Sequence, residues 1–239
     1  MSKRLFISKQ RDPRLLYRGE VASRLDNLTD AVFGIAITLL IFNQVNPNSF
    51  ADLLSFTKTL PAFLMSISFV LLIWREHQRY SLVYSLEDSY IALYNTFFIA
   101  LVIFYVYPLR FLSLFLTNLF FDTHIDVNIS GEQVPDLMVY YGLAAFALYF
   151  LLFLFYLRAF RDRQNLELSS YETFYTRYQL IKMGIMFSVP LISVAVTLIL
   201  QHYSIFAASL GGGLTYWLYT PAMIIWYRRF SKGALQFPV

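Results

Sequence analysis

The sequence predicts an all-α, polytopic membrane protein with six transmembrane helices per subunit. Hydrophobic residues make up 58% of the 239 residues and aromatic residues 19%, whereas charged residues make up only 14%. Soluble globular domains carry about 25% charged residues. Four uncharged, histidine-free runs are each long enough to cross about 30 Å of hydrocarbon, and they cover 89–109, 137–157, 183–200 and 203–227. Composition and run length therefore both place the chain in a lipid bilayer.

Two shorter apolar runs, 31–45 and 59–74, precede these four. Both fall below the roughly 20 residues that a lipid-facing helix needs. We therefore expect these two helices inside the assembly and the last four in its outer shell. No internal repeat or long linker divides the chain. Residues 1–239 are therefore expected to form a single six-helix transmembrane domain that begins with a basic cytoplasmic arm, 1–21.

The basic residues indicate the orientation in the membrane. Of the 19 Lys and Arg residues, 17 precede the first run, follow the second, lie between the fourth and fifth, or follow the sixth. Loops rich in Lys and Arg stay in the cytoplasm. We therefore expect a multi-pass protein of the plasma membrane with both termini cytoplasmic, in contact with membrane lipids. The net charge of +4 is explained by this topology, and no nucleic-acid partner is expected.

Signatures of catalysis and of cofactor binding are missing from the sequence. The chain has no cysteine and none of the common nucleotide-binding, hydrolase or zinc-protease motifs. Its three histidines, His77, His124 and His202, are too scattered for one metal site. The sequence predicts neither an enzyme nor a resident cofactor or metal.

The first apolar helix begins with charges, in the segment RLDNLTDAVFGIAITLL at 24–40. At about 100° per residue, one stripe within an arc of about 100° follows the spacing i, i+3, i+4, i+7. Its members are Ile35, Thr38, Leu39 and Phe42. Asp30 lies about 130° from the centre of this stripe. If the stripe faces a pore, the Asp30 carboxylate points toward neighbouring helices; an apolar stripe of this kind also fits ordinary packing.

This segment resembles the signature of the transmembrane protein 175 family of potassium channels, in its prokaryotic six-helix form. The signature is an arginine, then Phe-Ser-Asp, then an apolar run that ends in Ile-Thr-Leu-Leu. The matching residues are Arg24, Asp30, Ile35, Ile37, Thr38, Leu39 and Leu40. Leu28, Thr29 and Gly34 replace the phenylalanine, serine and alanine of the pattern. A Trp-x-x-His pair, Trp74 and His77, and the early helix residue Asn95 also fit the family.

The resemblance implies a homotetramer in which the first helix of each subunit lines a central pore. Longer animal members carry two six-helix repeats, whereas this chain carries one. The resemblance then makes Ile35 the narrowest hydrophobic ring, Leu39 and Phe42 further apolar rings, and Thr38 a ring of hydroxyls that contacts potassium. No TVGYG filter occurs in the chain. The function implied is a leak-type, potassium-permeable cation channel with potassium as the permeant ion.

The charged start of this helix is expected to have a structural and gating role. We predict an inner network that holds the pore helix against the second and third helices. Its six members are Arg24, Thr29, Asp30, Trp74, His77 and Asn95. Indole, imidazole and amide groups supply enough N–H donors to satisfy a buried carboxylate.

Two other functions are compatible with a polytopic membrane protein. A secondary transporter of a cation or small solute requires broken helices and a polar site near the bilayer midplane, and here the midplane is almost wholly apolar. An intramembrane enzyme requires converging catalytic groups, which the sequence does not show. Passive flux with unitary current steps distinguishes a channel from a transporter.

Overall fold

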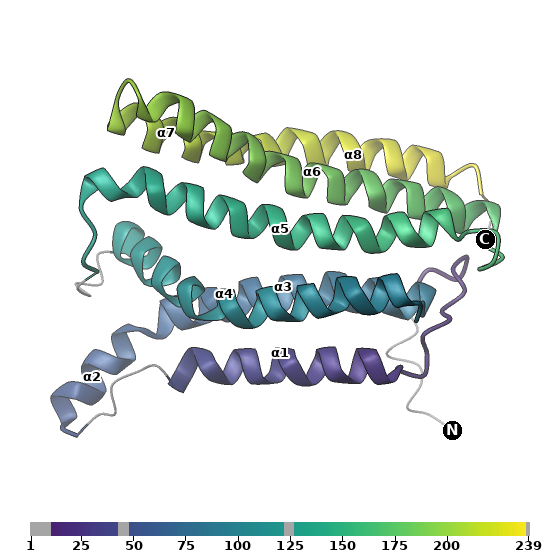
Figure 1. Ribbon diagram of the computed structural model, residues 1–239, viewed down its shortest axis with the longest axis horizontal. Helices are drawn as coiled ribbons and strands as arrows, with labels where there is room; N and C mark the ends of the chain where they lie inside the picture. Colours follow the sequence, from purple (N-terminus) through teal and green to yellow (C-terminus); the bar gives the residue numbers. More distant parts are fainter. Residues whose placement is uncertain (1–10, 43–47, 122–126, 238–239) are drawn as a thin grey trace.

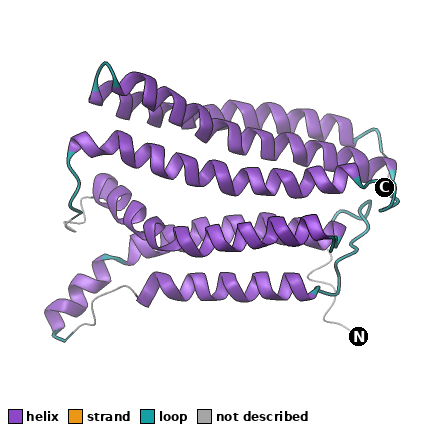
Figure 2. Cartoon of the chain, viewed as in Figure 1, coloured by secondary structure: helices purple, strands orange, loops and turns teal. Residues whose placement is uncertain are grey.

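The computed structural model describes residues 11–42, 48–121 and 127–237, and of Ile41 and Phe42 only the backbone. Figure 2 shows that these ranges fold into helices and connecting loops, without strands. The α-helices are α1 (Arg24–Phe42), α2 (Phe50–Lys58), α3 (Leu60–Tyr84), α4 (Ser89–Phe121), α5 (Val134–Arg161), α6 (Ser170–Gln201), α7 (Ile205–Thr215) and α8 (Tyr219–Ala234). Two short 3-10 helices, η2 (Gly131–Gln133) and η3 (Tyr216–Leu218), precede α5 and α8. The all-α prediction is confirmed.

Four helices in the described part of the chain are long and apolar enough to cross a membrane. They are α3, α4, α5 together with η2, and α6. The helix α1 carries Arg24, Asp26 and Asp30 within its 19 residues, and the last predicted span is divided between α7 and α8. Six transmembrane helices per subunit therefore remain a prediction.

The long helices lie side by side, and each runs in the opposite direction to the next one along the chain. Figure 1 shows α1 at one edge of the molecule, next to α3 and α4. The helix α5 follows, then α6, and α7 and α8 line up end to end along the opposite edge. The helices α1 and α8 therefore occupy opposite edges of the subunit. The start of α1 and the end of α8 lie at the same end of the bundle, which is the end that carries most of the basic residues.

Two helices extend well beyond their apolar runs. The helix α3 continues past Trp74 to Tyr84, and α6 begins at Ser170 instead of residue 183. Arg75, Arg79, Arg177 and Lys182 consequently lie in helices, whereas the sequence placed them in loops. A helix continues through charged residues where they find partners or reach water.

The contact between these extensions is an ion pair. Lys182 Nζ lies 2.6 Å from Glu76 Oε1, and Arg79 Nη1 lies 3.4 Å from the same oxygen. All three side chains are less than half exposed. The pairing compensates charges that would be costly near the membrane interior and joins α3 to α6.

The sixth predicted span, 203–227, is not one continuous helix. Pro221 lies in the first turn of α8, directly after the 3-10 helix η3. Proline lacks the N–H that would continue the hydrogen bonds of a helix, and its ring displaces the carbonyl four residues earlier. The 3-10 segment thus ends within one turn of the proline, although proline also occurs inside the unbroken helices α4 and α6. On the preceding segment, Gly212 packs so closely on α6 that an added Cβ would lie 2.1 Å from Thr197 Oγ1.

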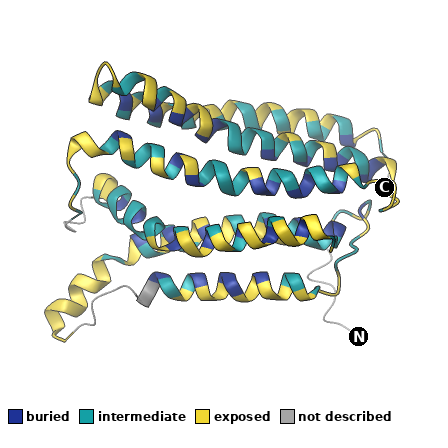
Figure 3. Cartoon of the chain, viewed as in Figure 1, coloured by how far each residue is buried: buried dark blue, intermediate teal, exposed yellow. Residues whose placement is uncertain are grey.

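The apolar pattern of the sequence does not predict the short helix α2. Ser49 caps it by accepting a hydrogen bond from the Asp52 backbone N–H at 3.1 Å. Pro61, in the first turn of α3, separates the two helices, since proline is favoured at the start of a helix and disfavoured inside one. None of the nine residues of α2 is buried, and Figure 3 shows this helix as an exposed arm.

Candidate pore-lining helix

One face of α1 is covered by its own subunit. This face packs on α3 and α4, and its side chains are at most 8% exposed: Thr29, Val32, Phe33, Ala36 and Leu40. These positions follow the i, i+3, i+4, i+7 spacing of a helix face. The position of α1 at the edge of the subunit is therefore fixed by ordinary apolar packing.

The opposite face of α1 is left uncovered. Four side chains form a continuous exposed strip along it: Leu28, Ala31, Ile35 and Thr38. Ile35 is 54% exposed and Leu28 is 51% exposed. Large apolar residues in such a strip indicate a surface that meets another copy, lipid or a dewetted pore.

The other two predicted pore residues lie differently. Leu39 is half-buried and packs against the subunit core, so it lies at the edge of the strip. The side chain of Phe42 falls outside the described residues. The exposed strip therefore extends toward the start of α1, through Ala31 and Leu28, whereas the pore face predicted from the sequence extends from Ile35 to Phe42.

The hydroxyl of Thr38 has a fixed orientation. Its Oγ1 donates a hydrogen bond to the Ile35 carbonyl oxygen at 2.7 Å. The hydroxyl proton is thereby used within the helix, and the lone pairs of Oγ1 remain free for another partner. On an exposed face, this arrangement presents an oxygen acceptor, which is what a partly dehydrated cation requires.

A buried hydrogen-bonded cluster lies behind α1. Asn95 Nδ2 donates to Thr29 Oγ1 at 2.8 Å, and His77 Nε2 lies 3.0 Å from Asn95 Oδ1. Thr29 and Asn95 are fully buried and His77 is 5% exposed. Asn95 on α4 thus connects α1 to α3, and we call these three residues the Asn95 hub.

Aromatic side chains enclose the hub. The His77 ring stacks on Phe98 with centroids 5.1 Å apart, and it meets the edge of Phe155 of α5 at 5.3 Å. Phe33 of α1 lies against Phe98 as well, at 5.9 Å. The hub is therefore held between α1, α3, α4 and α5, away from water, where hydrogen bonds are strong and unpaired polar groups are costly.

The predicted six-residue network is divided in the structure. Trp74 Nε1 donates to Asp30 Oδ1 at 2.8 Å, and this pair is exposed and separate from the hub. Asp30 is therefore not a buried carboxylate that all the donors share, because Trp74 bonds to it in an exposed pair, whereas His77, one turn further along α3, is buried against Asn95. Among the described contacts, no hydrogen bond or ion pair joins Arg24 to the other five residues.

Other contacts between helices were also not predicted from the sequence, and two of them involve α3. Ser66 Oγ of α3 donates to Ser113 Oγ of α4 at 2.8 Å, and both serines are fully buried. The Glu76–Lys182 ion pair is the second. Small hydroxyl residues at helix contacts are common in membranes, and that rule could have drawn attention to Ser66 and Ser113.

The described part of the N-terminal arm is bound to the basic end of the bundle by hydrogen bonds and ion pairs. Arg18 Nη1 lies 2.7 Å from Glu172 Oε1, at the start of α6. Arg14 donates to the carbonyl oxygens of Ala234 and Phe237 and pairs with Asp12 at 2.8 Å. The hydrogen bond from Arg14 lowers the pKa of Asp12 to about 2. The Arg14–Asp12 ion pair therefore persists at physiological pH, and together with Arg18–Glu172 it holds the segment that leads into α1.

No group of three or more His, Cys, Asp or Glu side chains converges within the described residues. Long apolar helices beside a first helix with an uncovered apolar and hydroxyl strip define a polytopic helical membrane protein. The class that they define is compatible with a channel assembled from several copies.

Comparison with known proteins identifies the family. The family model of the endosomal/lysosomal potassium channel TMEM175 matches residues 24–105. A potassium channel of Marivirga tractuosa is 36% identical over 229 residues, which are 92% of each chain. The chain therefore belongs to the TMEM175 family of potassium channels, and it is not an enzyme.

Solved structures agree in fold. A variant of the potassium channel MtTMEM175, crystallised with a nanobody–MBP fusion protein, superposes with a TM-score of 0.84 at 34% identity. This match covers 93% of the present chain and 99% of the other. A TMEM175 homologue from Chamaesiphon Minutus matches with a TM-score of 0.52 at 20% identity, over 83% and 96% of the two chains, and supports the fold alone.

Proposed function

We propose that the protein is a leak-type potassium channel in which four copies of α1 surround a central pore. The observation that carries this proposal is the uncovered strip of Leu28, Ala31, Ile35 and Thr38 on a helix at the edge of the subunit. A single helix cannot enclose a pore, so the strip needs symmetry-related copies. Membership of a potassium-channel family supports potassium as the permeant ion.

In this assembly Ile35 forms the constriction. Its side chain is more than half exposed within one subunit, and four copies around an axis would form an apolar ring. Such a ring opposes conduction because water leaves a narrow apolar passage, and an ion cannot cross it without its hydration shell. The constriction requires no moving gate and fits a low-conductance leak.

Thr38 forms the ring that contacts the ion, one helical turn from Ile35. Because the hydroxyl proton is donated to the Ile35 carbonyl oxygen of the same helix, the lone pairs of each Oγ1 are available to an ion in the pore. Four such oxygens replace part of the hydration shell of a potassium ion but do not form a closed carbonyl cage. We therefore expect a modest preference for potassium over sodium.

Asp30 supports the pore helix in this proposal and does not line the pore. Its carboxylate accepts the indole N–H of Trp74, which holds α1 against α3. Its position about 140° around the helix from Ile35 turns the charge away from the axis. A charge ring at this level is thus not part of the selectivity mechanism.

Replacing Thr38 by alanine tests the role of the hydroxyl ring. We expect conduction to persist while the permeability ratio of potassium to sodium falls toward one, because the oxygen ligands are removed and the pore stays open. The measurement is the reversal potential of purified protein in planar bilayers under bi-ionic conditions.

The matched control is Thr96→Ala. Thr96 is also exposed, and its hydroxyl also donates within its own helix, to the Ala92 carbonyl at 2.8 Å; it lies on α4, outside the strip. An unchanged ratio in Thr38→Ala, or an equal change in Thr96→Ala, would place the selectivity elsewhere. Saturable flux without current steps in the parent protein would favour a transporter.

A further inference from the structure

A groove of about 520 Å³ lies between α6 and α8, at the edge of the subunit opposite α1. Its apolar walls are supplied by Ile181 and Ile185 of α6 and by Ala222 and Ile225 of α8. If α1 faces the pore axis, this edge faces lipid. The inference that follows therefore depends on the proposed channel arrangement and its orientation.

The groove changes character along its length. Its walls are apolar near Ile185, in the middle of α6, and near Ala222, at the start of α8, and they become aromatic and basic toward the end of α8. The distance from Arg177 to Ile185 is about 12 Å at 1.5 Å rise per residue. That span accommodates a headgroup at one end and a substantial part of an acyl chain along the rest.

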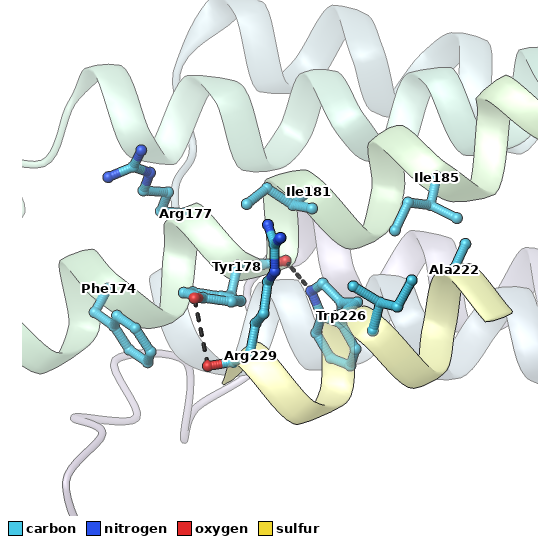
Figure 4. Close-up of a pocket in the computed structure, with 9 residues that line it drawn as sticks. Phe174, Arg177, Tyr178, Ile181, Ile185, Ala222, Trp226 and Arg229 are labelled. Carbon is cyan, nitrogen blue, oxygen red and sulfur yellow. Dashed lines mark hydrogen bonds between the residues drawn. The ribbon is translucent and has the colours of Figure 1, made fainter. Parts of the chain in front are cut away.

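The basic end carries two arginines from different helices. Arg177 and Arg229 both line the groove, and Figure 4 shows the Arg229 side chain reaching from α8 toward Tyr178 and Ile181 of α6. Both residues are exposed. Within the described residues, no carboxylate pairs with either guanidinium. Their charge is thus available to a phosphate, which guanidinium groups bind with two hydrogen bonds.

The aromatic part of the groove is held in place. Trp226 Nε1 donates to the Tyr178 carbonyl oxygen at 2.8 Å, as Figure 4 shows. The Trp226 ring also stacks on Phe230 with centroids 5.6 Å apart. Tryptophan and tyrosine prefer the level of the lipid headgroups. The groove therefore combines two aromatic residues that suit the headgroup level, Tyr178 and Trp226, with two arginines and an apolar path for an acyl chain.

We propose that this groove binds one anionic phospholipid of the cytoplasmic leaflet. The phosphate lies against Arg177 and Arg229, and one acyl chain follows Ile181 and Ile185. Charge complementarity favours this occupant over a zwitterionic lipid, because two unpaired cations meet a ligand of net negative charge. The cytoplasmic side follows from the basic end of the bundle, where these arginines lie.

The experiment measures contact between lipid tails and Trp226. Full-length protein is reconstituted in vesicles with phosphatidylglycerol or phosphatidylcholine brominated on the acyl chains, since bromine quenches tryptophan at contact. The chain has three tryptophans, so the Trp226 contribution is the difference between the parent and Trp226→Phe. We expect phosphatidylglycerol to be preferred, and the double change Arg177→Gln and Arg229→Gln to lower its relative affinity by about fivefold per arginine.

Arg228→Gln is the matched control, because Arg228 is the exposed neighbour of Arg229 and does not line the groove. It should retain the preference, and added inorganic phosphate should not reduce it. Equal quenching by both lipids in the parent, no loss in the double variant, or an equal loss in Arg228→Gln overturns the proposal. Shielding of Trp226 from both lipids overturns it in favour of a protein occupant.

Potassium flux is recorded in the same vesicles to separate the two proposals. A preserved lipid preference without potassium flux counts against the channel mechanism and leaves the lipid site standing. A missing preference with normal flux counts against the lipid site alone.

Discussion

Replacing Ile35 by asparagine is expected to raise passive potassium flux by about tenfold or more. Burying or exposing an apolar side chain of this size changes the free energy by about 1.5–3 kcal/mol, and a tenfold change in rate requires only about 1.36 kcal/mol. In the proposed tetramer, four polar side chains in place of four isoleucines would keep water in the constriction. The measurement is potassium flux from vesicles at equal protein content.

Ile199→Asn provides the control for this prediction. Ile199 is 61% exposed on α6, far from the uncovered strip of α1, so the same chemical change there should leave flux as it was. An unchanged flux in Ile35→Asn contradicts the constriction. A rise of similar size in both variants would mean that leakage follows from damaged packing in general.

Replacing Asn95 by leucine is expected to cause the largest loss of stability. The substitution removes two hydrogen bonds of the hub at once, because the Asn95 amide N–H donates to Thr29 and its side-chain carbonyl oxygen accepts from His77. A buried polar group left without its partner costs about 1–3 kcal/mol. Thr29 keeps its bond to the Leu25 carbonyl at 2.9 Å, so most of the cost falls on His77.

The unfolding midpoint in detergent and the yield of the proposed tetramer measure this effect. Both should fall in Asn95→Leu and stay near the parent value in Thr96→Val, a change at the exposed neighbouring position. A parent-like midpoint for Asn95→Leu would show that apolar packing around Phe98 holds α1 in place by itself. Loss of stability with an unchanged ion preference in the surviving channels is the expected combination.

Much of the fold follows from composition and run length, because long apolar segments have few stable arrangements in a bilayer. The ends of α3 and α6 could not be found in this way. The apolar run stops at the first charge, whereas the helix continues because Glu76 and Lys182, distant in sequence, pair across the two helices. The break before α8 is different, since Pro221 lies inside the apolar run 203–227 and run length alone takes no account of it.

The site was predicted in part for a similar reason. Helical angles place Asp30 about 140° around α1 from Ile35, and in the structure the Asp30 carboxylate accepts the indole N–H of Trp74 on α3. Angles within one helix do not determine how α1 sits against α3, so they could not assign Trp74 and His77 to different clusters. Arg177 and Arg229 are far apart in sequence, and only the packing of α8 on α6 brings them to one groove.

Cysteine accessibility is the measurement that tests the central claim most directly. The parent chain contains no cysteine, so single Thr38→Cys and Ala36→Cys variants each offer one target for a charged, thiol-specific reagent. If the uncovered strip lines the pore, the reagent blocks potassium flux through Thr38→Cys and leaves Ala36→Cys unaffected, because Ala36 is fully buried on the opposite face. Full conduction by a Thr38→Cys channel whose cysteine has demonstrably reacted would contradict the claim that α1 surrounds the pore.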